Sequence, residues 1–271
     1  MVIHLVKFKR IESMEVDPCL LLRLIDLSEK SISEIFPLCE LRSFQEGDAI
    51  DLGSSIFHRA PFIVQSGHVS SRYRNGNPVM NILDIYGPKT LLGEAVFFGD
   101  FPNPEFRCET AVKVLALPTK EILTALAKER MFANHLTKLS YWRYSHGECN
   151  RNVNKTKDAF LRVTFLLSHF VCALSQSHSY AVEETGGAVG KALTIPIKQS
   201  VLANHFDVSR TIFSQCIQKL EAKGWLHLGY GHIDFLKLPL WKQMYQTHQK
   251  NELTDLEPFE KIASGSGHLG L

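Results

Sequence analysis

The spacing of apolar residues changes along the chain and predicts helices on both sides of a strand-rich segment. Residues 17–36 carry an apolar stripe at helical spacing and are predicted to form one helix. Residues 39–117 instead show short apolar runs separated by turn sequences rich in Gly, Asn and Asp. This texture predicts many short strands in a small all-β sandwich or roll. Thr119 is then expected to cap a short helix that runs to Lys128.

A near-heptad seam along residues 131–157 predicts one long helix, because this stretch has neither proline nor a strong strand pattern. The seam is apolar in its first half and polar in its second, and we interpret it as a dimerisation face. Its members are Phe132, Leu136, Leu139, Arg143, His146, Asn150 and Val153. Further helices are predicted over residues 159–175 and 239–249, with a loop and a small hairpin over 175–190.

Residues 202–221 carry the most informative pattern of the chain, a short helix, a tight turn and a longer amphipathic helix. The first helix is predicted over residues 198–206. The second starts at Ser209 as N-cap and ends at Gly224 as the C′ residue. Residues 225–236 then read as a β-hairpin, which is the position of a wing. The inward residues of the second helix are expected to be Ile212, Phe213, Cys216, Ile217 and Leu220.

The outward face of the second helix offers hydroxyl, amide and guanidinium groups and no carboxylate, which suits the base edges of the DNA major groove. Candidate DNA contacts are Ser209, Arg210, Thr211, Ser214, Gln215 and Gln218. The surrounding segment is basic, since residues 191–250 hold eight Lys or Arg against three Asp or Glu. A basic bias of this kind favours contact with phosphates.

Composition excludes several classes of protein. The chain has 271 residues, 45% of them hydrophobic, with a net charge of +2, which is ordinary for a globular protein. No apolar run approaches the roughly 20 residues of a membrane span, and the N-terminus lacks the features of a signal peptide, so a cytoplasmic protein is expected. The six cysteines are scattered without a CxxC pair, which signals neither a zinc site nor a disulfide framework. No catalytic motif is visible, and no enzyme is predicted.

The order of these motifs resembles the cyclic-AMP receptor protein / fumarate-nitrate regulator (CRP/FNR) family of bacterial transcription factors over residues 35–240. The helix-turn-helix and its wing carry the closest match. Weaker matches are Phe62 to Val69, Gly93 to Gly99, and the strand from Thr110 to Leu117. The resemblance implies an α+β fold with an N-terminal cyclic-nucleotide-binding-like β-roll (jelly roll), a long dimerisation helix and a C-terminal winged helix-turn-helix. The corresponding division is 15–130 for the β-roll domain, 131–157 for the helix, 158–250 for the DNA-binding domain and 251–271 for a flexible tail.

The resemblance also implies a function. It predicts a homodimeric transcription regulator that binds double-stranded DNA at a palindromic promoter site, with RNA polymerase as a candidate partner. Arg210, Thr211 and Gln215 fall on the family's recognition positions, where Arg210 is expected to contact guanine. The alternative is a small-ligand sensor, resembling cyclic-nucleotide binders, whose winged helix contacts protein.

The effector region departs from the family's cyclic-nucleotide binders, which place an Arg-Ser pair about ten residues after Gly-Glu. Gly93 and Glu94 are present, but Arg107 is the only arginine in the segment that follows, Gly99 to Cys108, and it falls later in register. A buried phosphate without a paired cation is costly, so cyclic AMP is not expected as the effector. Too few cysteines lie together for an iron–sulfur cluster. Haem on His58, His68 or His146 stays open, and we predict no cofactor, no metal and an unidentified effector.

Overall fold

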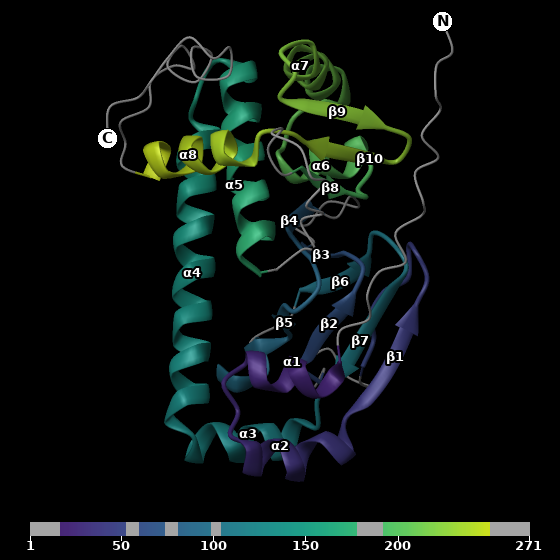
Figure 1. The fold of residues 1–271 in the computed structure, drawn as a ribbon, viewed down its shortest axis with the longest axis vertical. Coiled ribbons are helices and arrows are strands. Elements are labelled where there is room, and N and C mark those ends of the chain that lie inside the picture. The colour runs from purple at the N-terminus through teal and green to yellow at the C-terminus, as the bar shows by residue number, and fades with distance from the viewer. Residues whose placement is uncertain (1–16, 53–59, 74–80, 99–103, 178–191, 250–271) are drawn as a thin grey trace, which may run out of the picture.

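A computed structural model describes residues 17–52, 60–73, 81–98, 104–177 and 192–249 (Figure 1). The chain starts with two short helices, α1 (Pro18–Leu24) and α2 (Glu29–Ile35), and a 3₁₀ turn, η1 (Phe36–Leu38). The prediction of one helix here was wrong. Asp26 adopts a left-handed backbone with φ 60°, which an α-helix cannot contain. Ser28 then caps α2 by accepting a hydrogen bond from the Ser31 N–H at 3.2 Å.

The strand-rich segment forms the predicted β-roll from two antiparallel sheets, one in the order β1-β7-β2-β5 and one in the order β4-β3-β6. Side chains on β2 alternate between two cores, as the twofold period of a strand requires. Phe62 and Val64 pack between the sheets, whereas Ile63 packs against the N-terminal helices. The strands are β1 (Glu40–Phe44), β2 (Phe62–Ser66), β3 (Val69–Tyr73), β4 (Asn81–Tyr86), β5 (Leu91–Leu92), β6 (Glu105–Cys108) and β7 (Val112–Ala116), with the 3₁₀ segment η2 (Glu94–Phe98) after β5.

Two helices follow the roll, α3 (Thr119–Lys128) and the long α4 (Arg130–Asn154). Thr119 is the first helical residue of α3 and Pro118 its N-cap, so the predicted cap is displaced by one position. The apolar residues of the predicted α4 seam pack against other elements of the same chain. Phe132 and Leu136 lie in the core beneath the roll, and Val153 packs against the C-terminal helices.

The C-terminal part combines the predicted winged helix-turn-helix with one unpredicted strand, β8, which pairs with β10 to widen the wing sheet to the order β8-β10-β9. A single core holds this part together around five fully buried aromatic side chains: Phe206, Phe213, Trp225, Phe235 and Trp241. Its elements are α5 (Ala159–Ser177), β8 (Leu193–Ile195), α6 (Gln199–His205), α7 (Arg210–Ala222), β9 (Leu226–Gly229), β10 (His232–Phe235) and α8 (Leu238–Gln249).

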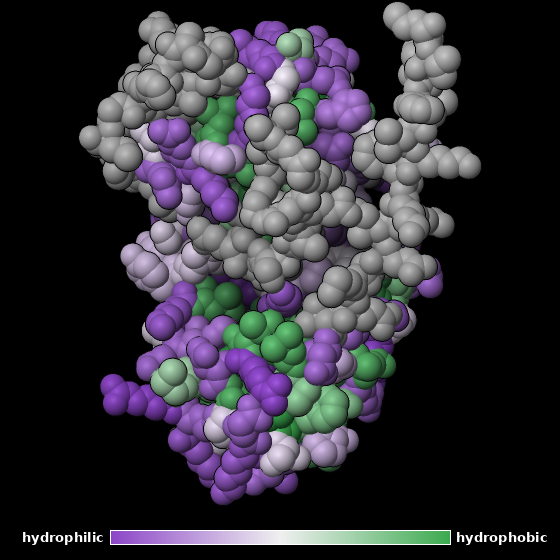
Figure 2. Space-filling model, viewed as in Figure 1, coloured by the Kyte–Doolittle hydropathy of each residue, from purple (hydrophilic) through white to green (hydrophobic). Residues whose placement is uncertain are grey.

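The β-roll half leaves several large hydrophobic side chains exposed, and hydrophobic surface is visible on the lower half of the molecule in Figure 2. These side chains include Leu20, Leu24, Phe36, Leu38 and Leu41. Within the described residues, no helix combines the length and the apolarity needed to cross a membrane. The predicted hairpin of residues 175–190 and the predicted tail of 251–271 fall almost wholly outside the described residues.

Candidate nucleic-acid interface

The turn between α6 and α7 is tight and fixed by its own backbone. Asp207 adopts φ 50°, the left-handed conformation that aspartate tolerates, and the Val208 N–H donates to the Ala203 carbonyl at 3.0 Å. Ser209 is the N-cap, as predicted, and its Oγ accepts from the Ile212 N–H at 3.2 Å. These local bonds set the angle at which α7 leaves α6.

The inner face of α7 anchors the helix. Phe213, Cys216, Ile217 and Leu220 are buried in the C-terminal core, as predicted. Ile212 is not, because its side chain is 37% exposed. At 100° per residue, Ile212 lies about a quarter turn from the middle of the buried stripe, so it reaches the side of the helix instead of the core.

The outer face of α7 is open. Arg210, Thr211, Gln215 and Gln218 are exposed, and Ser214 is half-buried. Among the described residues, none forms a side-chain hydrogen bond or an ion pair with these five. The face therefore presents polar groups that remain available to a ligand.

The wing is joined firmly to α7. Trp225, which is fully buried, donates its N–H to the Leu220 carbonyl at 3.0 Å and accepts at its own carbonyl from the Leu236 N–H. Glu221 Oε1 accepts from the Leu228 N–H at 2.8 Å. Tyr230, at the tip between β9 and β10, is fully exposed. Sequence reasoning missed the role of Glu221, since only the folded hairpin brings the Leu228 N–H to it.

The predicted effector residues do not come together. Gly93 has φ 78°, and a Cβ there would lie 3.1 Å from the Pro61 Cα, so this position requires glycine. Arg107 is exposed on β6, where its Nε donates to the Gly47 carbonyl at 2.9 Å. Glu94 instead forms an ion pair with Arg143 of α4.

Arg143 occupies a site that the sequence pattern did not reveal. Its guanidinium donates to the Leu91 carbonyl at 2.5 Å and lies 5.3 Å from the centre of the Tyr86 ring. Burial lowers the pKa of Arg143. The carboxylate of Glu94 is thus neutralised by the long helix, so a bound ligand would have to compete with Arg143 for it.

Neither a protein-family model nor a curated protein matches the sequence. Solved structures do match the fold. FixK2 from Bradyrhizobium japonicum superposes with a TM-score of 0.59 at 14% identity, over 80% of this chain and 98% of that one. A CRP/FNR family transcriptional regulator from Thermus thermophilus gives 0.51 at 21% identity, over 77% and 100%. The chain has the CRP/FNR fold.

A third match is a cyclic nucleotide-binding domain containing protein from Listeria monocytogenes. Its TM-score is 0.56 at 12% identity, and the match covers 81% of this chain and 96% of that one. All three matches span both the β-roll and the winged helix-turn-helix. The order of domains expected from the sequence resemblance is therefore the order of this fold.

Proposed function

We propose that this chain is a sequence-specific DNA-binding transcription regulator. The observation that carries the proposal is the outer face of α7, which is exposed, polar and free of carboxylates within a chain of CRP/FNR fold. An α-helix fits the major groove, and donors on its first turns reach base edges there. We propose the corresponding domain division as well. Residues 15–130 are the β-roll domain, 131–157 the long dimerisation helix, 158–250 the DNA-binding domain and 251–271 the tail.

Each residue of the outer face has a proposed role. Arg210, at the start of α7, donates two hydrogen bonds to a guanine, and Gln215 one turn later reads an adenine or a flanking base. Thr211 offers a methyl group and a hydroxyl to neighbouring bases. The N-terminus of α7 at Ser209 contacts a phosphate, while Ser214 and Gln218 line the groove.

We propose that the regulator is a homodimer on a palindromic site. The exposed face of α4 supports this, because Tyr141 and Tyr144 are 72% and 65% exposed and Met131 is 63% exposed. At 100° per residue, Tyr141 lies opposite the seam that packs within the chain, whereas Met131 lies about a quarter turn from that seam. A dimer that binds two half-sites of a palindrome would need its two recognition helices about 34 Å apart, one turn of DNA.

We propose that the effector, if the protein has one, is not cyclic AMP. Glu94 is already paired with Arg143, and Arg107 is bonded elsewhere on the roll. The alternative function, a small-ligand sensor whose winged helix contacts protein, becomes an outcome of the test below.

The test is selection of bound fragments from random DNA, followed by titration of the selected site. We expect a palindrome, and we expect Arg210→Ala to weaken binding by about 10- to 100-fold and to relax one base position in each half-site. Arg42→Ala, on the β-roll, is the matched control and should bind like the parent. No enrichment, or full affinity and selectivity in Arg210→Ala, would contradict the proposal.

A further inference from the structure

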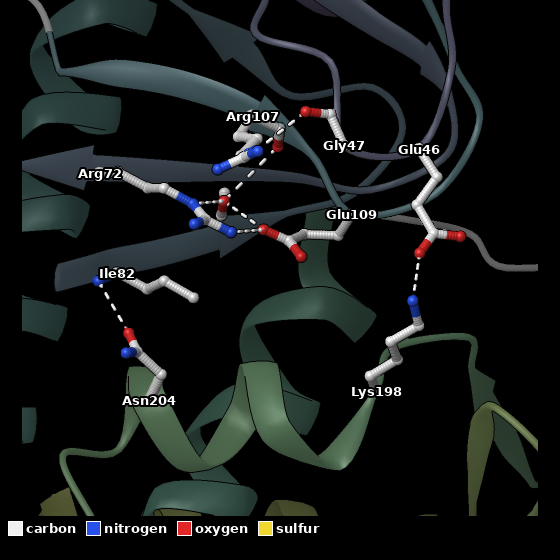
Figure 3. A network of polar contacts seen from close by, with 9 residues as sticks. Glu46, Gly47, Arg72, Ile82, Arg107, Glu109, Lys198 and Asn204 are labelled. Atoms are coloured by element: carbon white, nitrogen blue, oxygen red, sulfur yellow. Dashed lines mark hydrogen bonds and ion pairs between the residues drawn. The ribbon is translucent and has the colours of Figure 1, made fainter. Parts of the chain in front are cut away.

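The C-terminal part is joined to the β-roll through α6 and β4. The Ile82 N–H of β4 donates to Asn204 Oδ1 of α6 at 3.1 Å, and at the other end of α6 Lys198 forms an ion pair with Glu46 (Figure 3). Ile82 and Ile85 are buried in the core of the C-terminal part. We call this contact the joint.

The roll is braced beside the joint. Arg72 forms an ion pair with Glu109 at 2.6 Å, and the Ser70 hydroxyl donates to the same carboxylate at 2.5 Å (Figure 3). These bonds tie β3, the neighbour of β4, to the residue after β6.

Three buried histidines lie across the interface between the two parts. His146 comes from α4, on the β-roll side. His169 of α5 and His205 of α6 come from the C-terminal part, α5 to α8, which we call the reading domain. His146 and His169 are 6% and 1% exposed, with ring centres 6.0 Å apart. The Nδ1 atoms of all three are buried, and none has a hydrogen-bond partner among the described residues. We call these three residues the histidine seam.

The groups that face the seam supply little to stabilise positive charge. Asp84 of β4 lies 3.9 Å from His205 Nε2 and is the one carboxylate paired with the seam among the described residues. On the other side, His248 Nδ1 of α8 lies 3.2 Å from His169 Nε2, and the ring of Tyr245 packs edge-on to His169. The remaining titratable groups nearby are Cys149, Cys172 and Lys242 around α8. On the side of β4, Arg143 of α4 interacts with Asp84.

Burial disfavours the charged forms of His169 and His205. Burial, with the nearby His146 and His248, lowers the pKa of His169 to about 3. Burial and the nearby His146 also lower the pKa of His205, against the opposing effects of Asp84 and of a hydrogen bond with the Ile82 backbone. In the closed state a proton on His169 or His205 would bury a positive charge on a ring whose Nδ1 is shielded from water and has no hydrogen-bond partner among the described residues.

We propose that the histidine seam is a proton-responsive lock: acid separates the reading domain from the β-roll at the joint while both parts stay folded. Any open state in which His169 or His205 meets water binds a proton below about pH 6.5, whereas burial in the closed state disfavours that proton. Each such group therefore shifts the equilibrium towards the open state by up to about tenfold per pH unit below that value. This inference does not depend on which DNA the protein binds.

The Ile82 amide reports the joint directly, because its acceptor lies on the opposite part. Amide hydrogen exchange on the full chain at pH 7.5 and 5.5, corrected for intrinsic exchange, measures its opening. Two reference amides report folding, Val64 in the roll and Trp225 in the reading domain. We expect opening at Ile82 to increase about tenfold or more at pH 5.5 while both references stay much better protected than Ile82, because both parts remain folded.

A variant with fewer titratable groups separates protonation of the seam from other acid effects. His146→Gln/His169→Gln is expected to reduce the acid response at Ile82 several-fold, and His205→Gln serves if that pair does not fold. His135→Gln is the matched control, since His135 lies on α4 away from the seam and pairs with Asp26. The proposal is overturned if Ile82 shows no acid response, if all three amides open together, or if the seam variants respond like the parent.

Discussion

Glu94 and Arg143 form an ion pair that joins the segment after β5 to the long helix α4, across 49 positions of sequence. Their side chains are only 19% and 15% exposed. The pair fastens the β-roll to the helix at the place where the fold's cyclic-nucleotide binders use their glutamate for a ligand, as the sequence resemblance implies. It has consequences both for stability and for ligand binding.

Removing Arg143 is expected to destabilise the fold strongly. Arg143→Met leaves the Glu94 carboxylate buried without its partner, which typically costs about 3–5 kcal/mol of unfolding free energy. Denaturant titration measures this loss. Arg42→Ala, which breaks the exposed pair with Glu40, is the control and should cost at most about 1 kcal/mol. A small loss in Arg143→Met, similar to that of the control, would show that the buried pair contributes little.

Cyclic AMP is expected to leave the thermal unfolding midpoint unchanged, because Glu94 is engaged by Arg143. A ligand that binds the native state raises stability by RT ln(1 + [L]/Kd), so no shift at ~1 mM nucleotide implies a Kd of about 1 mM or weaker. Differential scanning calorimetry across a nucleotide series makes the measurement. A concentration-dependent rise that disappears in Glu94→Gln would instead place the nucleotide at this carboxylate.

Two glycines with the same backbone strain give a matched test of packing in the roll. Gly47 and Gly67 have φ of 91° and 84°, so alanine is strained at both by about 1–2 kcal/mol. A Cβ at Gly67 would lie 2.2 Å from the Ala111 carbonyl, whereas at Gly47 it meets nothing within 4 Å. Gly67→Ala is therefore expected to lower the melting temperature clearly more than Gly47→Ala, and equal losses would rule out the contact as the cause.

Acid is expected to destabilise the protein through His169. Its folded pKa of about 3 lies below the ordinary value of 6.5, so the unfolded chain binds a proton that the folded chain does not. The stability that this group contributes is full above pH 6.5 and falls by about 1.4 kcal/mol per pH unit between pH 6.5 and 3. His169→Gln should flatten the dependence of unfolding free energy on pH in this range. An identical slope in the variant would assign the acid response to other groups.

The reading domain was predictable from the sequence because its caps and turns depend on residues close together in the chain. Ser209, Asp207 and Gly224 are signals that act within a few residues, and each determines a cap or a turn whatever the rest of the chain does. The alternation in the roll and the helical period in α5 likewise indicate which faces are buried. Strand β8 was not predicted, because its three residues are too few to show the alternation of buried and exposed side chains.

Periodicity shows that a face is buried but not what buries it. The heptad-like seam of α4 was assigned to a second copy, yet Phe132 and Val153 pack within the chain. In the sequence, Arg143 interrupts the apolar positions of that seam. None of its neighbours in the sequence indicates that it pairs with Glu94. The same holds for His146, His169 and His205, which are far apart in sequence and meet only after α4, α5 and α6 pack together.

The bonds of Trp225 make α7 and the wing a single rigid piece. Neither element can then be adjusted separately to the width or curvature of a groove. If both touch the same duplex, the adjustment must come from the DNA, so base steps that bend or compress easily would be favoured even where no side chain reaches them. Part of the selectivity would then come from the mechanics of the site and not from its hydrogen-bonding groups.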